Sequence, residues 1–344
     1  MRILIIGQNH AAKAFANLLS EDKNNIIFAN FKDTEANFVD ISMGDVEEFK
    51  EFALANEINL TILCDIGAIE GGANFEAVFN EAGLSIFAPD KGAVKLSSSK
   101  GFAKKFMYRN RFKTPQFQIF DNMKMAIDWA RGANYPLVIK PDEHSNTYST
   151  TFSETFSSAK KVIGDFFNCD TKGIVIENFV SGRGFSAYFI TDGFNAFLLD
   201  FVETENNRFA SLGAGFLDDE KRARVVEIAS QTIGALAKTE NNYVGILGMD
   251  FILGDDNVLY ALEYNPFFDA LDVELFLGAF DINWAKLFES AVLGTLKDEF
   301  SAIKKYDGNF ATQIDEKGEV HFAKGRTLNE ARENLLEEGL AWKF

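Results

Sequence analysis

The sequence predicts a mixed protein that combines an α/β domain with α+β units. Three observations in the 344 residues predict this fold class. Strand and helix patterns alternate through residues 1–95, which indicates a parallel sheet flanked by helices. From Pro115 onward, strands and helices follow each other in the less regular order of compact α+β units. The segment Gly248–Pro266 then reads as two apolar strands joined by a polar turn.

The first 95 residues supply the elements of the parallel sheet. In chain order we expect a strand at Arg2–Ile6, a helix at Ala11–Leu19, a strand at Asn25–Phe28, a helix at Val46–Asn56, a strand at Leu60–Cys64, a helix at Asn74–Ala82 and a strand at Leu84–Phe87. Gly7 ends the first strand and Gly71-Gly72 lies beyond the third. These glycines therefore fall at the carboxyl ends of strands, where such sheets bind ligands.

A linking helix and a small α+β unit follow. The helix is expected at Ser97–Arg109, opened by a serine cluster. The unit comprises a strand at Gln116–Phe120, a helix at Met123–Arg131, strands at Pro136–Lys140 and Thr150–Thr155, a helix at Ser158–Phe167 and a strand at Gly173–Phe179.

The rest of the chain returns to strands and then to helices. We expect strands at Phe185–Ile190 and Ala196–Val202, a loop at Arg208–Phe216, a helix at Glu220–Lys238, the hairpin, helices at Asp272–Phe276 and Asn283–Gly294, and a tail with a short strand pair and a helix at Thr327–Glu338. The predicted domains are 1–96, a linker helix at 97–114, 115–182, 183–305 and 306–344.

Composition excludes several classes of function. The net charge of −17 argues against a protein that binds nucleic acid through a basic face. Cys64 and Cys169 are far apart in the sequence, which favours buried thiols in a reducing compartment. No signal segment and no apolar run of membrane-spanning length is present, so we expect a cytoplasmic protein without membrane contact.

The hairpin Gly248–Pro266 carries three oxygen-bearing side chains. Asp250 lies on its first strand, and Glu263 and Asn265 lie two residues apart on its second, which places those two on one face. Two carboxylates and an amide suit a hard cation, so Mg²⁺ is expected, with Mn²⁺ as an alternative. A hairpin whose polar face meets solvent would show the same residues.

Three charged residues precede the hairpin in the sequence and form an ordered set with its three polar residues. Lys100 opens the linker helix, Lys140 ends the strand PLVIK, and Glu177 ends the strand GIVIE. In this order, the chain resembles the ATP-grasp superfamily and, within it, the phosphoribosylamine–glycine ligase family. The matching phrases are MRILIIG, INLTIL, AGLSIFAP, SSKGFAKKFM, YPLVIKPD, IVIENFVSG and LEYN. The Asp-x12-Glu-x-Asn spacing is also similar to that of D-alanine–D-alanine ligases. Taken singly, each lysine equally fits a solvated position.

The resemblance implies a fold and a set of roles. The fold would be a Rossmann-like parallel sheet, then the ATP-grasp fold, then a short C-terminal α+β tail. The implied ATP-binding residues are Lys100 and Lys140 at the phosphates, Glu177 at the adenine amino group, and Asn178, Phe179 and Val180 along the ring edge. Asp250, Glu263 and Asn265 would hold one or two Mg²⁺ ions that bridge phosphate oxygens.

The implied reaction is ATP-dependent ligation of a small-molecule carboxylate to an amine through an acylphosphate, as in purine biosynthesis. It needs positioning and charge stabilisation, and no covalent enzyme intermediate. The resemblance also implies a monomer or a homodimer.

The sequence departs from the family pattern at several places. The lid loop after Asp142 contains neither glycine nor lysine, which leaves the hydroxyls of Ser145, Thr147, Ser149 and Thr150 as donors. Phe267 and Gly248 stand where related ligases carry arginine, so Arg183 or Arg208 is expected to supply the cation for the acylphosphate. The run GQNHAAKA and Asp65-Ile66 replace segments that build the phosphoribosylamine site.

Two other functions remain open from the sequence. One is a non-catalytic relative that binds a nucleotide or metabolite, or serves as an assembly partner. The other is a nicotinamide-dependent oxidoreductase built on the N-terminal sheet, although the G-x-G-x-x-G fingerprint is absent. His10, His144 and His321 form no recognisable set in the sequence.

Overall fold

The chain forms two compact units. The computed structural model describes residues 1–32, 34–65, 67–70, 73–143, 150–169, 171–206 and 208–337. The first unit contains Met1–Val94, Phe185–Gly248 and the residues from Asn265 onward, and the second contains Lys95–Gly184 and Met249–Tyr264. The finer domain boundaries stay a prediction.

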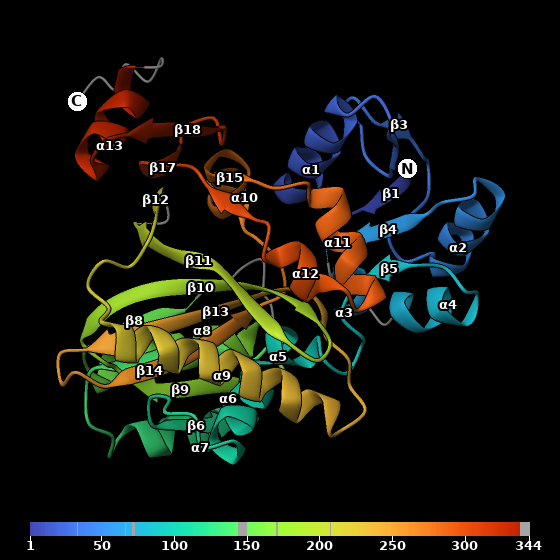
Figure 1. The fold of residues 1–344 in the computed structure, drawn as a ribbon. Helices are drawn as coiled ribbons and strands as arrows, with labels where there is room; N and C mark the ends of the chain where they lie inside the picture. The colour runs from blue at the N-terminus through green and yellow to red at the C-terminus, as the bar shows by residue number, and fades with distance from the viewer. Residues whose placement is uncertain are drawn as a thin grey trace. The chain divides into compact units, whose positions relative to one another are not determined.

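The first unit begins with a five-stranded parallel sheet in the order β3-β2-β1-β4-β5 (Figure 1). Its elements are β1 (Arg2–Ile6), α1 (His10–Glu21), β2 (Ile26–Ala29), β3 (Asn37–Phe38), α2 (Val46–Ala55), β4 (Leu60–Leu63), α3 (Gly67–Glu70), α4 (Phe75–Glu81) and β5 (Ile86–Phe87). The predicted parallel sheet with flanking helices is confirmed. Because Ile6 pairs with Leu63, the loops after β1 and β4 leave the sheet at the same edge.

The remainder of the first unit is an antiparallel sheet with helices. Its strands run in the order β13-β10-β11-β12-β17-β18. The elements are β10 (Gly182–Asp192), β11 (Ala196–Glu205), β12 (Phe209–Leu212), α9 (Asp219–Ala237), β13 (Val244–Gly254), α10 (Ala270–Ala279), β15 (Phe280–Asp281), α11 (Trp284–Leu293), α12 (Leu296–Phe300), β16 (Lys304–Lys305), β17 (Asn309–Ile314), β18 (Val320–Gly325) and α13 (Leu328–Glu337). Strands β10 and β13 each have one end in the second unit.

The predicted loop at Arg208–Phe216 is wrong. Phe209–Leu212 forms β12, which pairs with β11 on one side and with β17 on the other. Ser211 lies opposite both Glu203 and Ala311. One of its two partners thus lies 100 residues later in the chain (311 − 211), which no local pattern around residue 211 reveals.

Aromatic side chains fill the core of the first unit. The Phe15 ring lies 5.3 Å from the Trp284 ring and 5.2 Å from the Phe288 ring. In the same cluster, Phe267 meets the Phe15 ring edge-on and Phe268 stacks with it. These contacts tie α1 to α11 and to the segment that follows β14 (Leu259–Asn265).

The second unit is a four-stranded antiparallel sheet with helices and a hairpin. Its sheet runs β6-β9-β7-β8. The elements are α5 (Lys95–Ser98), α6 (Lys100–Arg109), β6 (Phe117–Phe120), α7 (Met123–Ala130), β7 (Leu137–Pro141), β8 (Thr151–Ser153), α8 (Phe156–Asn168), β9 (Ile174–Asn178), and the hairpin between β13 and β14. Buried residues of α7 and α8 pack against the sheet.

Two local expectations in this unit need correction. The helix predicted at Ser97–Arg109 is two helices, because Ser99 has extended backbone angles and its hydroxyl accepts a hydrogen bond from the Phe102 N–H. This is the geometry of a helix N-cap, which starts α6 afresh. Cys64 is buried as expected, whereas Cys169 is exposed, since it lies just past the C-terminus of α8.

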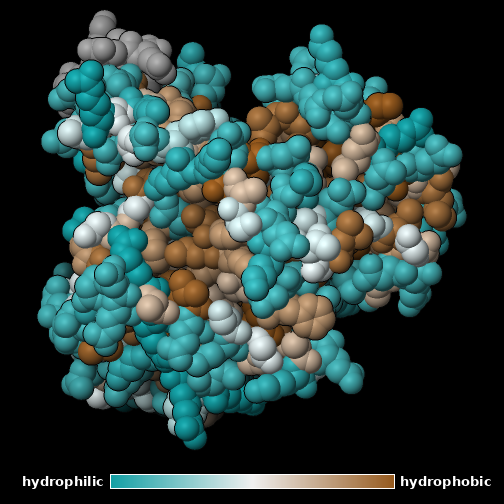
Figure 2. Space-filling view, in the orientation of Figure 1, coloured by the Kyte–Doolittle hydropathy of each residue, from teal (hydrophilic) through white to brown (hydrophobic). Residues whose placement is uncertain are grey.

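Hydrophilic residues cover much of the face shown in Figure 2, in keeping with the net charge of −17. Among the described residues, no helix combines the length and the apolar character that a membrane span requires. The fold class predicted from the sequence is confirmed.

Candidate functional site

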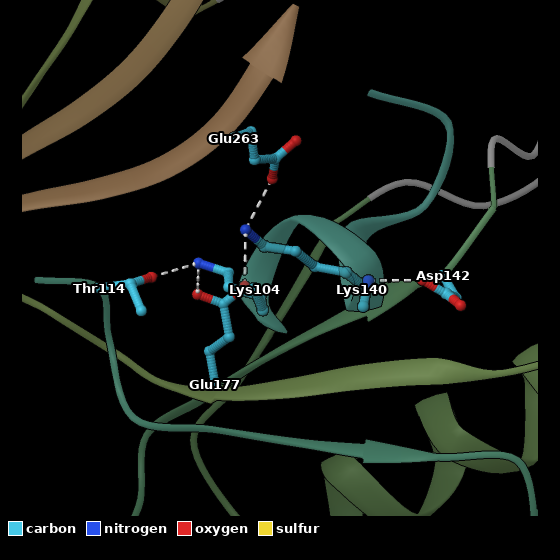
Figure 3. Close-up of polar contacts among 7 residues, drawn as sticks. Lys104, Thr114, Lys140, Asp142, Glu177 and Glu263 are labelled. Carbon is cyan, nitrogen blue, oxygen red and sulfur yellow. Dashed lines mark hydrogen bonds and ion pairs between the residues drawn. The ribbon is translucent and has the colours of Figure 1, made fainter. Parts of the chain in front are cut away.

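A buried group of lysines and glutamates lies in the second unit. Lys140 Nζ is 3.0 Å from Glu177 Oε1 and donates a hydrogen bond of 2.6 Å to Glu263 Oε1. Lys104 Nζ is 2.9 Å from Glu177 Oε2 and donates to Thr114 Oγ1, also at 2.9 Å. Figure 3 shows Lys140 reaching between the two glutamates while Lys104 lies between Glu177 and Thr114. We call these four charged residues the Lys–Glu cluster.

Different elements bring the cluster together. Lys104 is on the buried side of α6, Lys140 near the end of β7, Glu177 on β9 and Glu263 on β14. Strands β7 and β9 are antiparallel, and Val138 of β7 lies opposite Glu177 of β9. Lys140 is therefore two residues further along β7 than the position that faces Glu177. The cluster thus depends on sheet register, helix phase and the hairpin.

The charges in this cluster perturb one another. Burial lowers the pKa of Lys104. Burial also acts against the charge of Lys140, but the carboxylates of Glu177 and Glu263 outweigh it and raise the pKa of that lysine. For Glu263, burial acts to raise the pKa, but the positive charges of Lys140 and Lys100 outweigh it and hold the pKa below its usual range.

Lys100 and the cluster residues line the same small cavity, of about 10 Å³. Leu96, Ser97, Lys100, Ala103, Leu262 and Tyr264 line this cavity together with the cluster residues. Lys100 and Lys104 are four residues apart on α6 and so lie one helical turn apart on one face. The lining therefore holds three lysines and two glutamates, which leaves a net positive charge of one (3 − 2).

Asp142 fixes the start of α6 and thereby the positions of both helix lysines. Its Oδ1 accepts hydrogen bonds from Ser99 Oγ at 2.9 Å and from the Gly101 N–H at 2.6 Å. Its carbonyl oxygen accepts from the Lys100 N–H at 2.9 Å. Sequence reasoning missed the roles of Lys104 and Asp142, although their spacing from Lys100 and Lys140 was a usable signal.

The run after Glu177 lies at the end of β9. Asn178 Nδ2 donates to Gln116 Oε1 at 3.2 Å, and the Phe179 N–H donates to the Pro136 carbonyl at 3.2 Å. The Phe179 ring is exposed and meets the Phe152 ring edge-on at 5.0 Å. Val180 is half-buried. Both oxygens of Glu177 face lysines here, and the predicted adenine-binding role of this run stays a prediction.

Asn178 also lines a cavity of about 640 Å³ in the second unit. The other lining residues are Tyr108, Phe112, Lys113, Thr114, Pro115, Gln116, Phe117, Gln118 and Trp129. Its volume lies within the range of small-molecule pockets.

The predicted metal ligands fall on two adjacent strands. Asp250 on β13 and Glu263 on β14 both belong to the second unit and flank the turn in which the Asn257 N–H donates to the Gly254 carbonyl. The predicted turn is confirmed. Asn265 ends β14 and belongs to the first unit. Carboxylate oxygens suit a divalent cation, and Glu263 contacts Lys140 through Oε1, so the chemistry of Asp250 and Glu263 fits such an ion. The predicted set of three metal ligands stays a prediction.

The two predicted catalytic arginines are both exposed. Arg183 lies near the start of β10 and is not among the residues that line the small cavity. Arg208 is in the turn between β11 and β12, where its carbonyl oxygen accepts from the Ile314 N–H at 2.9 Å. Their catalytic roles stay predictions.

A second candidate site is a cavity of about 250 Å³ in the first unit. Asn9, Cys64, Asp65, Tyr188 and Asn265–Asp269 line it, and we call it the strand-end cavity. Phe267, the residue that replaces a family arginine, is 8% exposed and forms part of its wall. Asn9, from the run at residues 7–14, and Asp65 both lie where the sequence departs from the family pattern. Both residues line this cavity. His10 instead pairs with Glu274 at 2.8 Å.

Several sequence expectations lie outside the described residues. These are Gly71-Gly72, Ile66, His144 and the lid-loop hydroxyls of Ser145, Thr147 and Ser149. Thr150, the last of the four hydroxyl residues, is described and exposed.

Comparisons with known proteins show the family to which the chain belongs. Residues 98–273 match the family described as "Phosphoribosylglycinamide synthetase, ATP-grasp (A) domain". A phosphoribosylamine–glycine ligase of Clostridium acetobutylicum is 26% identical over 334 residues, which cover 90% of this chain and 79% of that protein.

Solved structures show the same fold. The phosphoribosylamine–glycine ligase of Thermotoga maritima aligns with a TM-score of 0.74 at 16% identity, covering 98% of this chain and 96% of that one. The biotin carboxylase domain of a Hydrogenobacter thermophilus 2-oxoglutarate carboxylase, solved with MgADP and bicarbonate, aligns with a TM-score of 0.72 at 13% identity, covering 91% and 74%. From its matched segment and its fold, the chain belongs to the phosphoribosylglycinamide synthetase family of ATP-grasp proteins.

Proposed function

We propose that this chain is an ATP- and Mg²⁺-dependent ligase that joins a small-molecule carboxylate to an amine, similar to phosphoribosylamine–glycine ligase. ATP-grasp proteins use ATP with a divalent metal. The observation that carries the proposal is the buried Lys140, which contacts both Glu177 and Glu263. A cation held between two carboxylates is poised to exchange one of them for a phosphate oxygen.

The lysines suit a polyphosphate. Lys100, Lys104 and Lys140 line one cavity together with Glu177, Glu263 and several apolar residues. Charge interactions are stronger there than in water, so each lysine contributes more to phosphate binding than an exposed lysine would. We assign phosphate contact to Lys100 and Lys140, and we assign Lys104 to holding Glu177 in place.

Asp250, Glu263 and Asn265 would hold the metal. A bound Mg²⁺ supplies positive charge to phosphate oxygens during transfer. Glu263 would keep its bond to Lys140 through Oε1 and offer its second oxygen to the metal. Lys140 would keep its contact with Glu177 as well.

The chain's contribution to the chemistry is positioning and charge compensation. The carboxylate substrate would accept the transferred phosphoryl group, and the amine would then displace phosphate from the acylphosphate. We assign the compensating cation to Arg183 or Arg208. The amine and carboxylate are small molecules, and a cytoplasmic location stays a prediction.

A second candidate function is nucleotide binding without ligation. One observation favours it: Phe267 occupies the position of a family arginine and packs 5.9 Å from Phe15 in the aromatic core. That position therefore contributes no cation. A non-catalytic relative would bind Mg-ATP and release no ADP in response to any substrate.

An ADP-release screen separates the two candidates. The chain with Mg-ATP is offered pairs of carboxylates and amines, beginning with glycine and phosphoribosylamine. Ligation predicts substrate-dependent ADP release, lost in Lys140→Met and kept in Lys172→Met, since Lys172 is an exposed lysine of the same unit. Nucleotide binding with no ADP release from any pair would favour the second candidate. If Mg-ATP does not raise the melting temperature at all, both are excluded.

A further inference from the structure

A cavity of about 640 Å³ lies beside β6, at an edge of the sheet in the second unit. Strand β6 ends the order β6-β9-β7-β8, so among the described residues only one of its long sides pairs with another strand. Phe117 and Gln118 of β6 line this cavity, and we call it the β6 cavity. Tyr108 from the end of α6 and Trp129 of α7 form further walls. The cavity therefore lies where the sheet edge meets two helices.

The β6 cavity is separate from the small cavity of the Lys–Glu cluster. The two cavities have no described lining residue in common. Glu177 points its carboxylate toward the lysines, whereas its neighbour Asn178 lines the β6 cavity. Adjacent side chains of a strand point to opposite faces of the sheet, which accounts for this separation. Of the residues that line the β6 cavity, only Asn178 is predicted to bind ATP, so the site is otherwise unassigned.

Aromatic side chains form much of the wall of the β6 cavity. They are Tyr108, Phe112, Phe117 and Trp129. The Trp129 ring meets the Phe120 ring at 5.8 Å, and this packing holds it in place. Aromatic side chains pair favourably with other rings in stacked or edge-on arrangements. The wall therefore suits a planar aromatic ligand.

Three amide side chains add hydrogen-bonding groups to this wall. They belong to Gln116, Gln118 and Asn178. Asn178 Nδ2 donates to Gln116 Oε1 at 3.2 Å, which engages one group of each amide. The amide nitrogen of Gln116 and the amide oxygen of Asn178 can then serve a ligand as donor and acceptor. Such groups match the ring N–H groups and ring nitrogens of a heteroaromatic molecule.

The lining of the β6 cavity is positively charged, although the whole chain carries a net charge of −17. Lys113 is the one charged residue among the described residues that line it. Its Nζ lies 5.7 Å from the centre of the Tyr260 ring. Asp256, the carboxylate that this charge influences, already accepts hydrogen bonds from the Val258 N–H and the Tyr260 hydroxyl. Lys113 would therefore attract an anionic group on a ligand and repel a cationic one.

We propose that the β6 cavity binds a planar heteroaromatic ligand that carries one anionic group. The aromatic residues contact the plane of the ring, the amides bond to its edge, and Lys113 pairs with the anion. The volume of about 640 Å³ falls within the range of small-molecule sites. This inference does not rest on the proposed ligase function, because the residues that carry it lie outside the Lys–Glu cluster.

A charge series on one ring system tests the proposal. Indole-3-acetate, tryptophol and tryptamine share an indole ring and carry a negative, a neutral and a positive side chain near neutral pH. Their dissociation constants for the full chain are measured by isothermal titration calorimetry, with and without saturating Mg-ATP. Indole-3-acetate should bind about fivefold or more tightly than tryptamine, with tryptophol between them. Mg-ATP should leave this binding in place.

Two substitutions assign the binding to the β6 cavity. Lys113→Met should remove the preference for indole-3-acetate over tryptamine. Tyr108→Ala should weaken the binding of indole-3-acetate by about threefold or more, since the ring is 74% exposed and its loss leaves the core intact. Lys172→Met and Tyr306→Ala are the matched controls, because they remove an exposed lysine and an exposed tyrosine that do not line the cavity. Both controls should bind as the parent chain does.

Three results would overturn the inference. The first is that indole-3-acetate does not bind, or binds no more tightly than tryptamine. The second is that the preference survives in Lys113→Met or that Tyr108→Ala binds as well as its control. The third is that saturating Mg-ATP abolishes binding, which would place the indole ring in the nucleotide site. Loss of the ligase proposal in the ADP-release screen would leave the inference unaffected, since none of these measurements uses turnover.

Discussion

Lys104 Nζ lies 2.9 Å from Glu177 Oε2, and the two side chains are 1% and 3% exposed. A pair buried this deeply is costly to break, because removing one partner leaves the other charge in a low-dielectric interior. The lysine that holds Glu177 is thus a structural requirement of the site, separate from the lysines assigned to phosphate.

Replacing Lys104 should destabilise the fold. Lys104→Met keeps a side chain of similar volume but removes the charge beside Glu177. We expect the free energy of unfolding to fall by about 3–5 kcal/mol. Lys105→Met is the matched control, because this neighbour is exposed and surface changes usually stay within about 0.5 kcal/mol. Urea unfolding gives the free energy of unfolding of both variants and of the parent chain. Equal losses of stability in Lys104→Met and Lys105→Met would contradict the structural role assigned to Lys104.

The bond between Lys140 and Glu263 predicts a pH dependence. The pKa of Glu263 is lowered, so the stabilisation is fully present above the ordinary glutamate pKa of about 4.3 and is lost as pH falls through the lowered native value. At pH 7, Glu263→Gln should cost about 1–3 kcal/mol. Unfolding free energies of both proteins, measured from pH 7 downward, should converge in acid. A difference that is constant with pH would show that the charge of Glu263 is not responsible.

Gly182 should tolerate no side chain. A Cβ there would overlap the Leu253 carbonyl oxygen and approach Gly254 Cα to 2.7 Å. We expect Gly182→Ala to destabilise the protein by about 1–3 kcal/mol. Gly164→Ala on α8 is the control, since a Cβ there meets nothing within 4 Å. Within a helix, alanine is more stable than glycine by about 0.5–1 kcal/mol. Thermal unfolding of the two variants should therefore shift in opposite directions.

The two cysteines should differ in reactivity. Burial raises the pKa of the Cys64 thiol, whereas Cys169 is exposed. A thiol reagent should modify one cysteine in the folded chain and two in urea. Cys169→Ser should abolish the reaction of the folded protein, and Cys64→Ser should leave it intact. Rapid modification of Cys64 under native conditions would refute the packing around β4.

Much of the site was predictable from the sequence because its residues end strongly patterned strands. Lys140 and Glu177 each close an apolar run, and Glu263 interrupts another, so each stands out from its neighbours by sequence pattern alone. No strand pattern marks Lys104 in this way. Its spacing of four residues from Lys100 was the available signal, and it places the two lysines on one face only because both lie on α6, which Ser99 caps.

The errors in the predicted fold have a common physical cause. Phe209–Leu212 pairs with β11 on one side and with β17, from far along the chain, on the other. The strand-end cavity likewise gathers residues from positions near 9, 65, 188 and 267. Local patterns report propensity and burial, whereas these features arise from tertiary contacts that override them.

The central claim is that the Lys–Glu cluster and the β13–β14 hairpin form a Mg-ATP site. The direct measurement is the Mg²⁺-dependent part of the ATP-induced thermal shift in the parent chain, in Glu263→Gln and in Asp256→Asn. Asp256 is the matched control, since it lies in the turn of the same hairpin and bonds to Val258 and Tyr260. We predict that Glu263→Gln loses the Mg²⁺-dependent part and that Asp256→Asn keeps it. A full Mg²⁺-dependent shift in Glu263→Gln would contradict the claim.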